Sequence, residues 1–423
     1  MRNTAYFSGK KITVLGLARS GYTCASLLSR LGAEVSVSDS SDNESTRSLA
    51  GQLDSGVIKI ELGTHSEEYI EGRDLVVISP GIPDSALPVF WAKQRGIKVV
   101  SEIEVAWSLC PAKVIAITGT NGKTTVTALI GKIIEASGKT VFTCGNIGNP
   151  FSGEVEKMRE GDFVSLEVSS FQLEHIVNFK PSIAVILNVS RNHLDRYADM
   201  REYLSAKKRI FMNQDSGDYL VLNQDDPAVS ALADDARSKA FFFSGRGGMN
   251  PNQAAVLEVG SLLGIDEKII HHVFKNFTGI EHRMEYVSNI DSVEFINDSK
   301  ATTVDSTMWA LNNSFVPVIL IAGGREKGND YSLLADLMRK KVRALVVIGE
   351  AKDKIKKAYG DFVFVEEALT LPEAVRKAFH KAQAGERVLF SPMCKSFDMF
   401  LNYEERGKVF KEAVYALNPK SRT

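Results

Sequence analysis

Residues 113–125 read KVIAITGTNGKTT, and this stretch decides the fold. An apolar run of strand-forming residues enters a loop with Gly119 and Gly122, after which Lys123 opens a segment with helical periodicity. In such a loop, glycines let backbone N–H groups approach phosphate oxygens, the helix N-terminus adds positive potential, and a lysine reaches the terminal phosphates. The stretch predicts a nucleotide-phosphate loop, which comprises Gly119, Thr120, Asn121, Gly122, Lys123, Thr124 and Thr125.

The loop is a shortened variant of the standard phosphate-loop pattern. The strict motif GxxxxGK[ST] would need glycine at Ile117. The order strand, glycine loop and helix nevertheless favours a phosphate site over a tight turn with a solvated lysine. Thr124 would then offer its hydroxyl group to Mg²⁺.

Composition limits the class of protein. The 423 residues predict about three domains, and 51 Lys and Arg against 52 Asp and Glu exclude a polybasic nucleic-acid arm. Four separated cysteines without a CxxC pair suggest neither a zinc knuckle nor a disulfide framework. The sequence shows no signal core and no apolar stretch long enough to span a membrane. We therefore expect a cytoplasmic protein with no nucleic-acid or membrane partner. We also expect it to be a monomer.

Strands and helices alternate on both sides of the phosphate loop. Residues 11–39 have the βαβ pattern, and further strands are expected in 74–83 and 96–104. More strands are expected in 162–170, 182–190 and 218–223, and a third series starts after residue 284. The pattern predicts an α/β protein of three α/β domains. They are a Rossmann-like N-terminal domain (1–106), a central P-loop domain with a parallel sheet (107–283) and a Rossmann-like C-terminal domain (284–423).

The first domain carries its own candidate ligand loops. Gly16 and Gly21 flank LARS, and Ala18 stands where GxGxxG requires its second glycine, which disfavours an NAD-dependent dehydrogenase. Asp39 ends the second expected strand, where a carboxylate can accept a hydrogen bond from a ribose hydroxyl. These features favour a nucleoside diphosphate. The expected ligand-binding residues are Gly16, Ser20, Asp39, Ser79, Pro80 and Gly81.

Polar side chains follow several other expected strands. Glu167 ends FVSLE, and His193 follows the next strand, which together with nucleotide phosphates would suit Mg²⁺. Taken by composition alone, the basic stretch 202–209 reads as a solvated helix face. In the last domain, Lys300, Lys327 and Ser396 are either grips for a small anion or ordinary polar loop residues.

Seven motifs occur together in one order: GTNGKTT, LEVSSFQLE, NVSRNHLDR, YLSAKKRI, GIEHRMEYV, NDSKATT and SPMCKSFDMF. This combination resembles the Mur ligase family over essentially the whole chain. The resemblance implies a three-domain fold and an ATP-dependent amide ligation through an acyl phosphate. Within the family, the motifs resemble those of members that add D-glutamate to UDP-N-acetylmuramoyl-L-alanine in peptidoglycan precursor synthesis. The implied partners are this UDP-sugar, D-glutamate, ATP and Mg²⁺.

The resemblance also implies roles for single residues. Lys123, Glu167, His193 and Lys207 would be catalytic, and Thr124, Glu167, His193 and Lys207 would serve metal ions, with Lys207 carbamylated by CO₂. Arg283 and Asp298 match nucleotide-contacting positions, and Asn146 matches a position on the UDP-sugar side. Thr302, Lys327, Ser396 and Tyr403 match positions that contact D-glutamate, although a Phe is common where Tyr403 stands.

One region departs from the family pattern. Between residues 227 and 250 the chain lacks some tens of residues that in the family include a G-x-H-N segment, whose Asn contacts adenine. Here the position of the His is Met249. Either Asn250 or Asn252 is then a candidate for the adenine contact.

Three further alternatives stay open at this stage. A sibling enzyme could add another amino acid, but the DNPR segment of the diaminopimelate enzyme is absent and KSFDMF favours glutamate. A folylpolyglutamate synthase would lack the nucleotide-sugar domain of residues 1–106. A nucleotide-binding scaffold without turnover need not keep the metal set, which comprises Lys123, Thr124, Glu167, His193 and Lys207.

Overall fold

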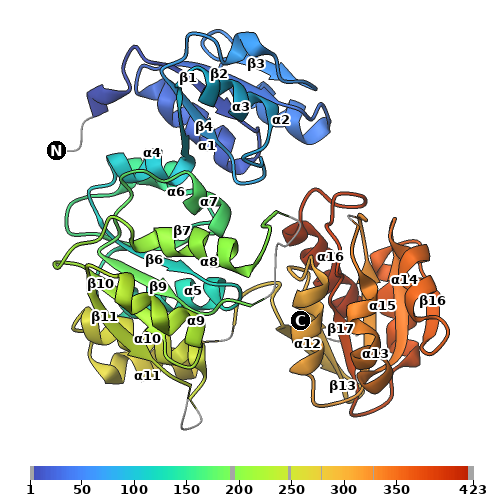
Figure 1. Ribbon diagram of the computed structural model, residues 1–423. Coiled ribbons are helices and arrows are strands. Elements are labelled where there is room, and N and C mark those ends of the chain that lie inside the picture. Colours follow the sequence, from blue (N-terminus) through green and yellow to red (C-terminus); the bar gives the residue numbers. More distant parts are fainter. Residues whose placement is uncertain (1–3, 191–195, 246–248, 278, 327, 418–423) are drawn as a thin grey trace. The chain divides into compact units, whose positions relative to one another are not determined.

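The computed structural model describes residues 4–190, 196–245, 249–277, 279–326 and 328–417. These residues form three β-sheets in chain order, so that each sheet has its own range of colours in Figure 1. The chain divides into two compact units, Met1–Phe277 and Thr278–Thr423. The first unit contains two of the sheets and the second unit contains one.

The first sheet has five parallel strands in the order β3-β2-β1-β4-β5. Its core is apolar on both faces, as the buried strand β4 with the sequence LVVI requires. The strand order reverses between β1 and β4, and ligands bind beyond the carboxyl ends of strands at such a switch point. The elements are β1 (Lys11–Leu15), α1 (Arg19–Arg30), β2 (Glu34–Asp39), α2 (Glu44–Gln52), β3 (Lys59–Leu62), β4 (Leu75–Ile78), α3 (Leu87–Gln94), β5 (Lys98–Ser101) and α4 (Glu102–Leu109).

The second sheet has six parallel strands in the order β11-β10-β9-β6-β8-β7. Helices α5, α10 and α11 pack on one face of this sheet, and α4, α6 and α7 contribute to the core on the other face (Figure 1). The elements are β6 (Lys113–Thr118), α5 (Lys123–Ala136), β7 (Val141–Gly145), α6 (Phe151–Glu154), β8 (Phe163–Glu167), α7 (Ser170–Glu174), β9 (Ile183–Ile186), α8 (Met200–Lys208), β10 (Tyr219–Asn223), α9 (Pro227–Ser230), β11 (Lys239–Phe243), α10 (Pro251–Leu262) and α11 (Glu267–Asn276).

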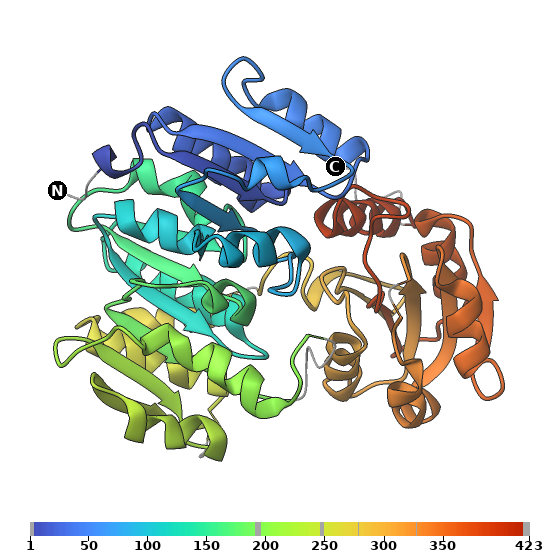
Figure 2. The same cartoon turned by 45° about the horizontal axis from the view of Figure 1, so that its top comes forward.

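The sheet of the second unit is mixed, with the order β12-β13-β17-β14-β15-β16. Strand β12 runs antiparallel to β13, and the other pairs are parallel. Figure 2 shows this unit, in orange and red, from a second direction. The elements are β12 (Glu285–Ile290), β13 (Val293–Asn297), α12 (Val304–Asn312), β14 (Val318–Gly323), α13 (Ala335–Lys341), β15 (Val342–Ile348), α14 (Lys352–Tyr359), β16 (Phe364–Glu367), α15 (Leu371–Lys381), β17 (Arg387–Phe390) and α16 (Tyr403–Leu417).

The α/β architecture with a parallel central sheet is confirmed. Helix starts follow local signals: Asp199 caps α8, Thr303 caps α12, and Ser169 forms a capping box with Gln172 at α7. Within the described parts of the chain, no helix is both long enough and apolar enough to cross a bilayer.

Candidate active site

The phosphate loop lies between β6, the third strand from the β7 edge, and the N-terminus of α5. Asn188, which follows β9, fixes the shape of the loop. The backbone N–H of Thr120 donates to the Asn188 carbonyl (2.9 Å), and that of Asn121 donates to Asn188 Oδ1 (2.8 Å). Asn188 Nδ2 donates in return to the Asn121 carbonyl (3.1 Å). Asn188, directly after the neighbouring strand β9, therefore fixes the conformation of the loop.

Gly122 ends the loop and caps α5 with a φ of +83°. Only glycine adopts this conformation without strain. A Cβ atom at this position would also collide with the side chain of Asn252, in the first turn of α10. Asn250 is occupied otherwise, because its Oδ1 accepts the backbone N–H of Asn252 (2.9 Å). Of the two candidate asparagines, it is Asn252 whose side chain faces the loop.

Two lysines meet at one carbonyl oxygen of the loop. Lys123 Nζ donates to the carbonyls of Gly119 (2.8 Å) and Thr120 (2.9 Å), and Lys207 Nζ donates to that of Gly119 (3.0 Å). Lys207 comes from α8, is 1% exposed and lies over the ring of Tyr203. Burial, and then repulsion by Lys123, lower the pKa of Lys207 well below its ordinary value. The expected solvated face is therefore wrong for Lys207, whereas the side chain of Lys208 is 40% exposed and pairs with Asp235 (2.8 Å).

Glu167 ends β8, the strand next to β6, and is 2% exposed. Its Oε1 accepts a hydrogen bond from Asn146 Nδ2 (2.8 Å), whereas its buried Oε2 has no hydrogen-bond partner among the described residues. A buried carboxylate oxygen without a donor fits a hard cation. Among the described residues, no three His, Cys, Asp or Glu side chains are grouped as a metal site would need. His193 lies outside the described residues.

The candidate UDP-sugar residues gather at the switch point of the first sheet. Asp39 holds the loop after β1, because its oxygens accept the backbone N–H groups of Leu17 (2.6 Å) and Ser41 (2.7 Å). Ser79 Oγ, after β4, donates to the Gly16 carbonyl (3.0 Å). A Cβ atom on Gly21 would collide with the same carbonyl, so glycine lets α1, which carries Ser20, approach this loop.

Arg196 was not singled out from the sequence, although the motif NVSRNHLDR contains it. Its Nη1 donates to the Pro80 carbonyl (2.9 Å), and its Nη2 donates to the Ile82 carbonyl (3.0 Å). Arg196, which lies between β9 of the second sheet and α8, thus holds the turn Ser79–Ile82 after the first sheet. Pro80 is half-buried and Gly81 is exposed.

In the second unit, three adjacent strands, β13, β17 and β14, end at the candidate loops 297–303, 391–400 and 322–331. Asp298 is buried; its Oδ2 accepts from Ser391 Oγ (2.9 Å), and its Oδ1 accepts the backbone N–H of Met284 (3.2 Å). Burial raises the pKa of Asp298 to about 7, although Arg283 opposes this shift. Lys327 lies outside the described residues.

Arg406, which the sequence did not reveal as a site residue, connects two of these loops. Its guanidinium is buried and donates to the carbonyls of Ser299 (2.8 Å) and Cys394 (3.1 Å). Ser299 Oγ in turn donates to the carbonyl of Tyr403, the first residue of α16 (2.8 Å). Ser396 is buried and Thr302 is half-buried on these loops. No sequence pattern distinguishes Arg406 from the other cations of α16.

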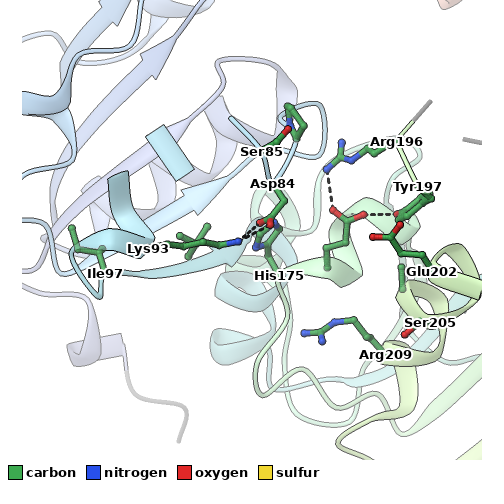
Figure 3. A pocket seen from close by; sticks show the side chains of 14 residues that line it. Asp84, Ser85, Lys93, Ile97, His175, Arg196, Tyr197, Glu202, Ser205 and Arg209 are labelled. Atoms are coloured by element: carbon green, nitrogen blue, oxygen red, sulfur yellow. Dashed lines mark hydrogen bonds and ion pairs between the residues drawn. The ribbon is translucent and has the colours of Figure 1, made fainter. Parts of the chain in front are cut away.

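A hollow of about 670 Å³ in the first unit is lined in part by Arg196, Tyr197 and Ser85 (Figure 3). None of the site residues predicted from the sequence lines it. Its lysine and arginine side chains already have partners in the protein. Lys93 pairs with Asp84 (2.6 Å), Arg196 pairs with Glu174 (3.0 Å), and Arg209 donates to the carbonyls of Leu173 and Ile176 (both 2.7 Å). No lysine or arginine that lines this hollow is therefore free to hold a phosphate.

Known protein families match the chain in three segments, one for each of the three sheets. Residues 10–101 match the Mur ligase MurD-like N-terminal domain, 117–273 the Mur ligase middle domain, and 282–394 the Mur ligase glutamate ligase domain. The UDP-N-acetylmuramoylalanine–D-glutamate ligase of Chloroherpeton thalassium is 42% identical, with 97% of this chain and 98% of that protein covered. The chain belongs to the Mur ligase family.

Other members support this assignment. The Geotalea daltonii protein of the same name is 40% identical over 97% of this chain and 98% of its own length. The structure of the MurC ligase of Thermotoga maritima, 18% identical, shares the fold with a TM-score of 0.62 over 96% of this chain and 100% of its own. The alignment with the Chloroherpeton ligase spans 462 residues, more than this Mur ligase possesses, so that relative holds residues that this chain lacks.

Proposed function

We propose that this Mur ligase joins D-glutamate to UDP-N-acetylmuramoyl-L-alanine, at the expense of ATP, in peptidoglycan precursor synthesis. The observation that carries the proposal is the similarity, over nearly the whole chain, to relatives named for this reaction. The phosphate loop with Lys123, Lys207 and Glu167 around it supports an enzyme over a scaffold without turnover. The protein would work as a monomer in the cytoplasm.

The reaction would proceed in two steps. A carboxylate oxygen of the L-alanyl group attacks the γ-phosphorus of ATP, the bond to the β-phosphate oxygen breaks, and ADP leaves. The amine of D-glutamate then attacks the acyl phosphate, loses a proton and expels inorganic phosphate, so that an amide forms. Neither step needs a protein nucleophile. Positioning and charge neutralisation by the loop N–H groups and Lys123 carry the catalysis.

Glu167, Thr124, His193 and Lys207 would hold Mg²⁺, which neutralises charge on the phosphates when it is bound. Lys207 suits this role only after modification, because an ammonium group repels a cation. Its lowered pKa favours the neutral amine, which adds to CO₂ and loses a proton to give a carbamate. The carbamate would provide the oxygen ligands that an unmodified lysine lacks.

Each substrate would use a different region of the chain. The UDP-sugar would bind to residues 1–106, through Gly16, Ser20, Asp39 and Ser79–Gly81, with Asn146 near its acyl end. ATP would bind to 107–283, with Asn252 proposed as the adenine contact because its side chain faces the loop. Arg283, the last residue of 107–283, and Asp298 of region 284–423 would also contact the nucleotide. For D-glutamate, region 284–423 would supply Thr302, Lys327, Ser396 and Tyr403.

Mass spectrometry of the product tests this proposal. The protein is incubated with Mg·ATP, UDP-N-acetylmuramoyl-L-alanine and an equimolar mixture of D-glutamate, L-glutamate and diaminopimelate, each with a different isotope label. We expect the UDP-sugar to gain one glutamate residue with the label of the D-isomer. Incorporation of diaminopimelate instead would indicate a sibling ligase, and an unmodified UDP-sugar would contradict the proposal.

A further inference from the structure

Arg196 hydrogen-bonds to the backbone of the turn Ser79–Ile82. This turn follows β4 and is closed by a hydrogen bond from the Ile82 N–H to the Ser79 carbonyl (3.0 Å). Two carbonyls of the turn, those of Pro80 and Ile82, accept from the two terminal nitrogens of Arg196 (2.9 and 3.0 Å). Arg196 precedes α8 and belongs to the part of the first unit that contains the second sheet.

The geometry suits arginine. A planar guanidinium presents its N–H groups as a fixed fork, which engages two acceptors at once, whereas the ammonium of lysine is a point charge. Arg196 Nη2 also pairs with Glu174 Oε2 (3.0 Å), and the two side chains are only 16% and 18% exposed. Because solvent screens such a partly buried pair weakly, the guanidinium is held firmly against the turn.

Aromatic side chains connect Arg196 to the phosphate loop. The guanidinium lies 4.1 Å from the centre of the Phe171 ring, and Phe171 stacks on Tyr197. Figure 3 shows Arg196 and Tyr197 converging on one carboxylate, that of Glu174.

Tyr197 in turn contacts Tyr203, with ring centres 5.2 Å apart. The hydroxyl of Tyr203 lies 3.4 Å from Thr120 Oγ1, and Lys207 Nζ lies 4.4 Å from the centre of the Tyr203 ring. The contacts therefore form one continuous path from the turn to the loop.

We propose that Arg196 is a positioning residue for the UDP-sugar: it sets the turn Ser79–Ile82 in the conformation that binds the UDP group. It also ties this turn, through Phe171, Tyr197 and Tyr203, to the loop that binds ATP. The inference rests on the proposed function, in which Ser79, Pro80 and Gly81 contact the UDP-sugar. Arg196 would act through the turn and would not itself touch the substrate.

The test compares two ligands on the full-length protein by titration calorimetry and steady-state kinetics. With Arg196→Ala, we expect the Kd and KM of UDP-N-acetylmuramoyl-L-alanine to rise roughly 10- to 100-fold, because the turn loses two charge-assisted hydrogen bonds. The Kd of Mg·ADP should change less than about threefold, because the loop keeps its contacts with Asn188. Arg196→Lys, which keeps the positive charge, should restore part of the UDP-sugar affinity. If Arg196→Ala does not fold, the lysine variant still provides the comparison of the two ligands.

Arg209→Lys is the matched control. Arg209 also donates to two backbone carbonyls, those of Leu173 and Ile176. Both carbonyls belong to the same part of the unit as Arg209, the part that contains the second sheet. Its substitution should leave the UDP-sugar KM unchanged. Equal losses of UDP-sugar and Mg·ADP binding in Arg196→Ala, or an unchanged UDP-sugar Kd, would overturn the inference. A wild-type protein that binds no UDP-sugar would overturn the proposed function and this inference with it.

Discussion

At the scale of single residues, burial decides the chemistry of Lys207. Its sequence neighbours Lys208 and Arg209 suggest a solvated helix face, yet the Lys207 amine is buried and shares the Gly119 carbonyl with Lys123. Neighbouring residues on a helix point in directions about 100° apart, so one can be buried while the next is exposed. Composition cannot show this difference, and only the family resemblance indicated a special role for Lys207.

We predict that turnover depends on CO₂ through Lys207. Wild-type activity should fall in CO₂-free buffer and return when bicarbonate is added, because the carbamate forms from CO₂ and the neutral amine that the lowered pKa of Lys207 favours. Lys207→Ala should be nearly inactive and partly rescued by a short carboxylic acid. Lys208→Ala should keep its activity; the side chain of Lys208 is 40% exposed and pairs with Asp235. Full activity of the wild type in CO₂-free buffer would refute carbamylation.

Asp298 should make the stability of the protein depend on pH. Its pKa is about 7 in the folded protein and about 4 in the unfolded chain, so the unfolded state ionises first as pH rises. The wild type should therefore lose stability between about pH 4 and 7, by up to roughly 4 kcal/mol, and Asp298→Asn should not. Urea denaturation at pH 5 and pH 8 measures the effect. A stability difference between the two proteins that stays constant with pH would contradict it.

At the scale of elements, the interior strands could be predicted from the sequence and several edge strands could not. The apolar runs that become β1, β4, β6, β8, β9 and β10 are nearly fully buried, which makes them recognisable. Strands β3, β7, β11 and β12 were not predicted. Each lies at the edge of its sheet, where partial exposure admits polar residues.

The junction of the phosphate loop with α5 gives a prediction about packing. Gly122→Ala should cost more stability than Gly138→Ala, at the other end of the same helix, where the φ is +80° and no atom lies within 4 Å of an added Cβ. The control should lose about 1 kcal/mol from backbone strain alone. The double variant Gly122→Ala/Asn252→Ala should recover part of the extra loss, because it removes the colliding amide. Equal losses at both glycines, measured by urea denaturation, would refute the close approach of α10 to the loop.

At the scale of the whole molecule, two compact units with separate cores predict a local response to UDP. UDP should slow hydrogen exchange in peptides of the first unit, above all those around Gly16 and Ser79, because a bound ligand stabilises the structure that holds it. Peptides of residues 279–417 should exchange as before. Comparable protection of both units by UDP alone would contradict the assignment of the UDP-sugar to the first unit.

Much of the candidate site could be predicted because its residues follow strands of parallel sheets, whose carboxyl ends meet at one edge. The contacts of Arg196 and Arg406 could not be predicted, because each bridges loops that are distant in the sequence. Such contacts depend on how sheets and loops pack, and no local pattern encodes them.

The most direct test of the proposed ligase activity is the release of inorganic phosphate from Mg·ATP in the presence of UDP-N-acetylmuramoyl-L-alanine. The account predicts release that depends on D-glutamate and is much slower with L-glutamate, with diaminopimelate or without an amino acid. Lys123→Ala should reduce this release by roughly two to four powers of ten, and Lys132→Ala, exposed on the same helix, should not. Folded wild-type protein that releases no phosphate with D-glutamate would contradict the account.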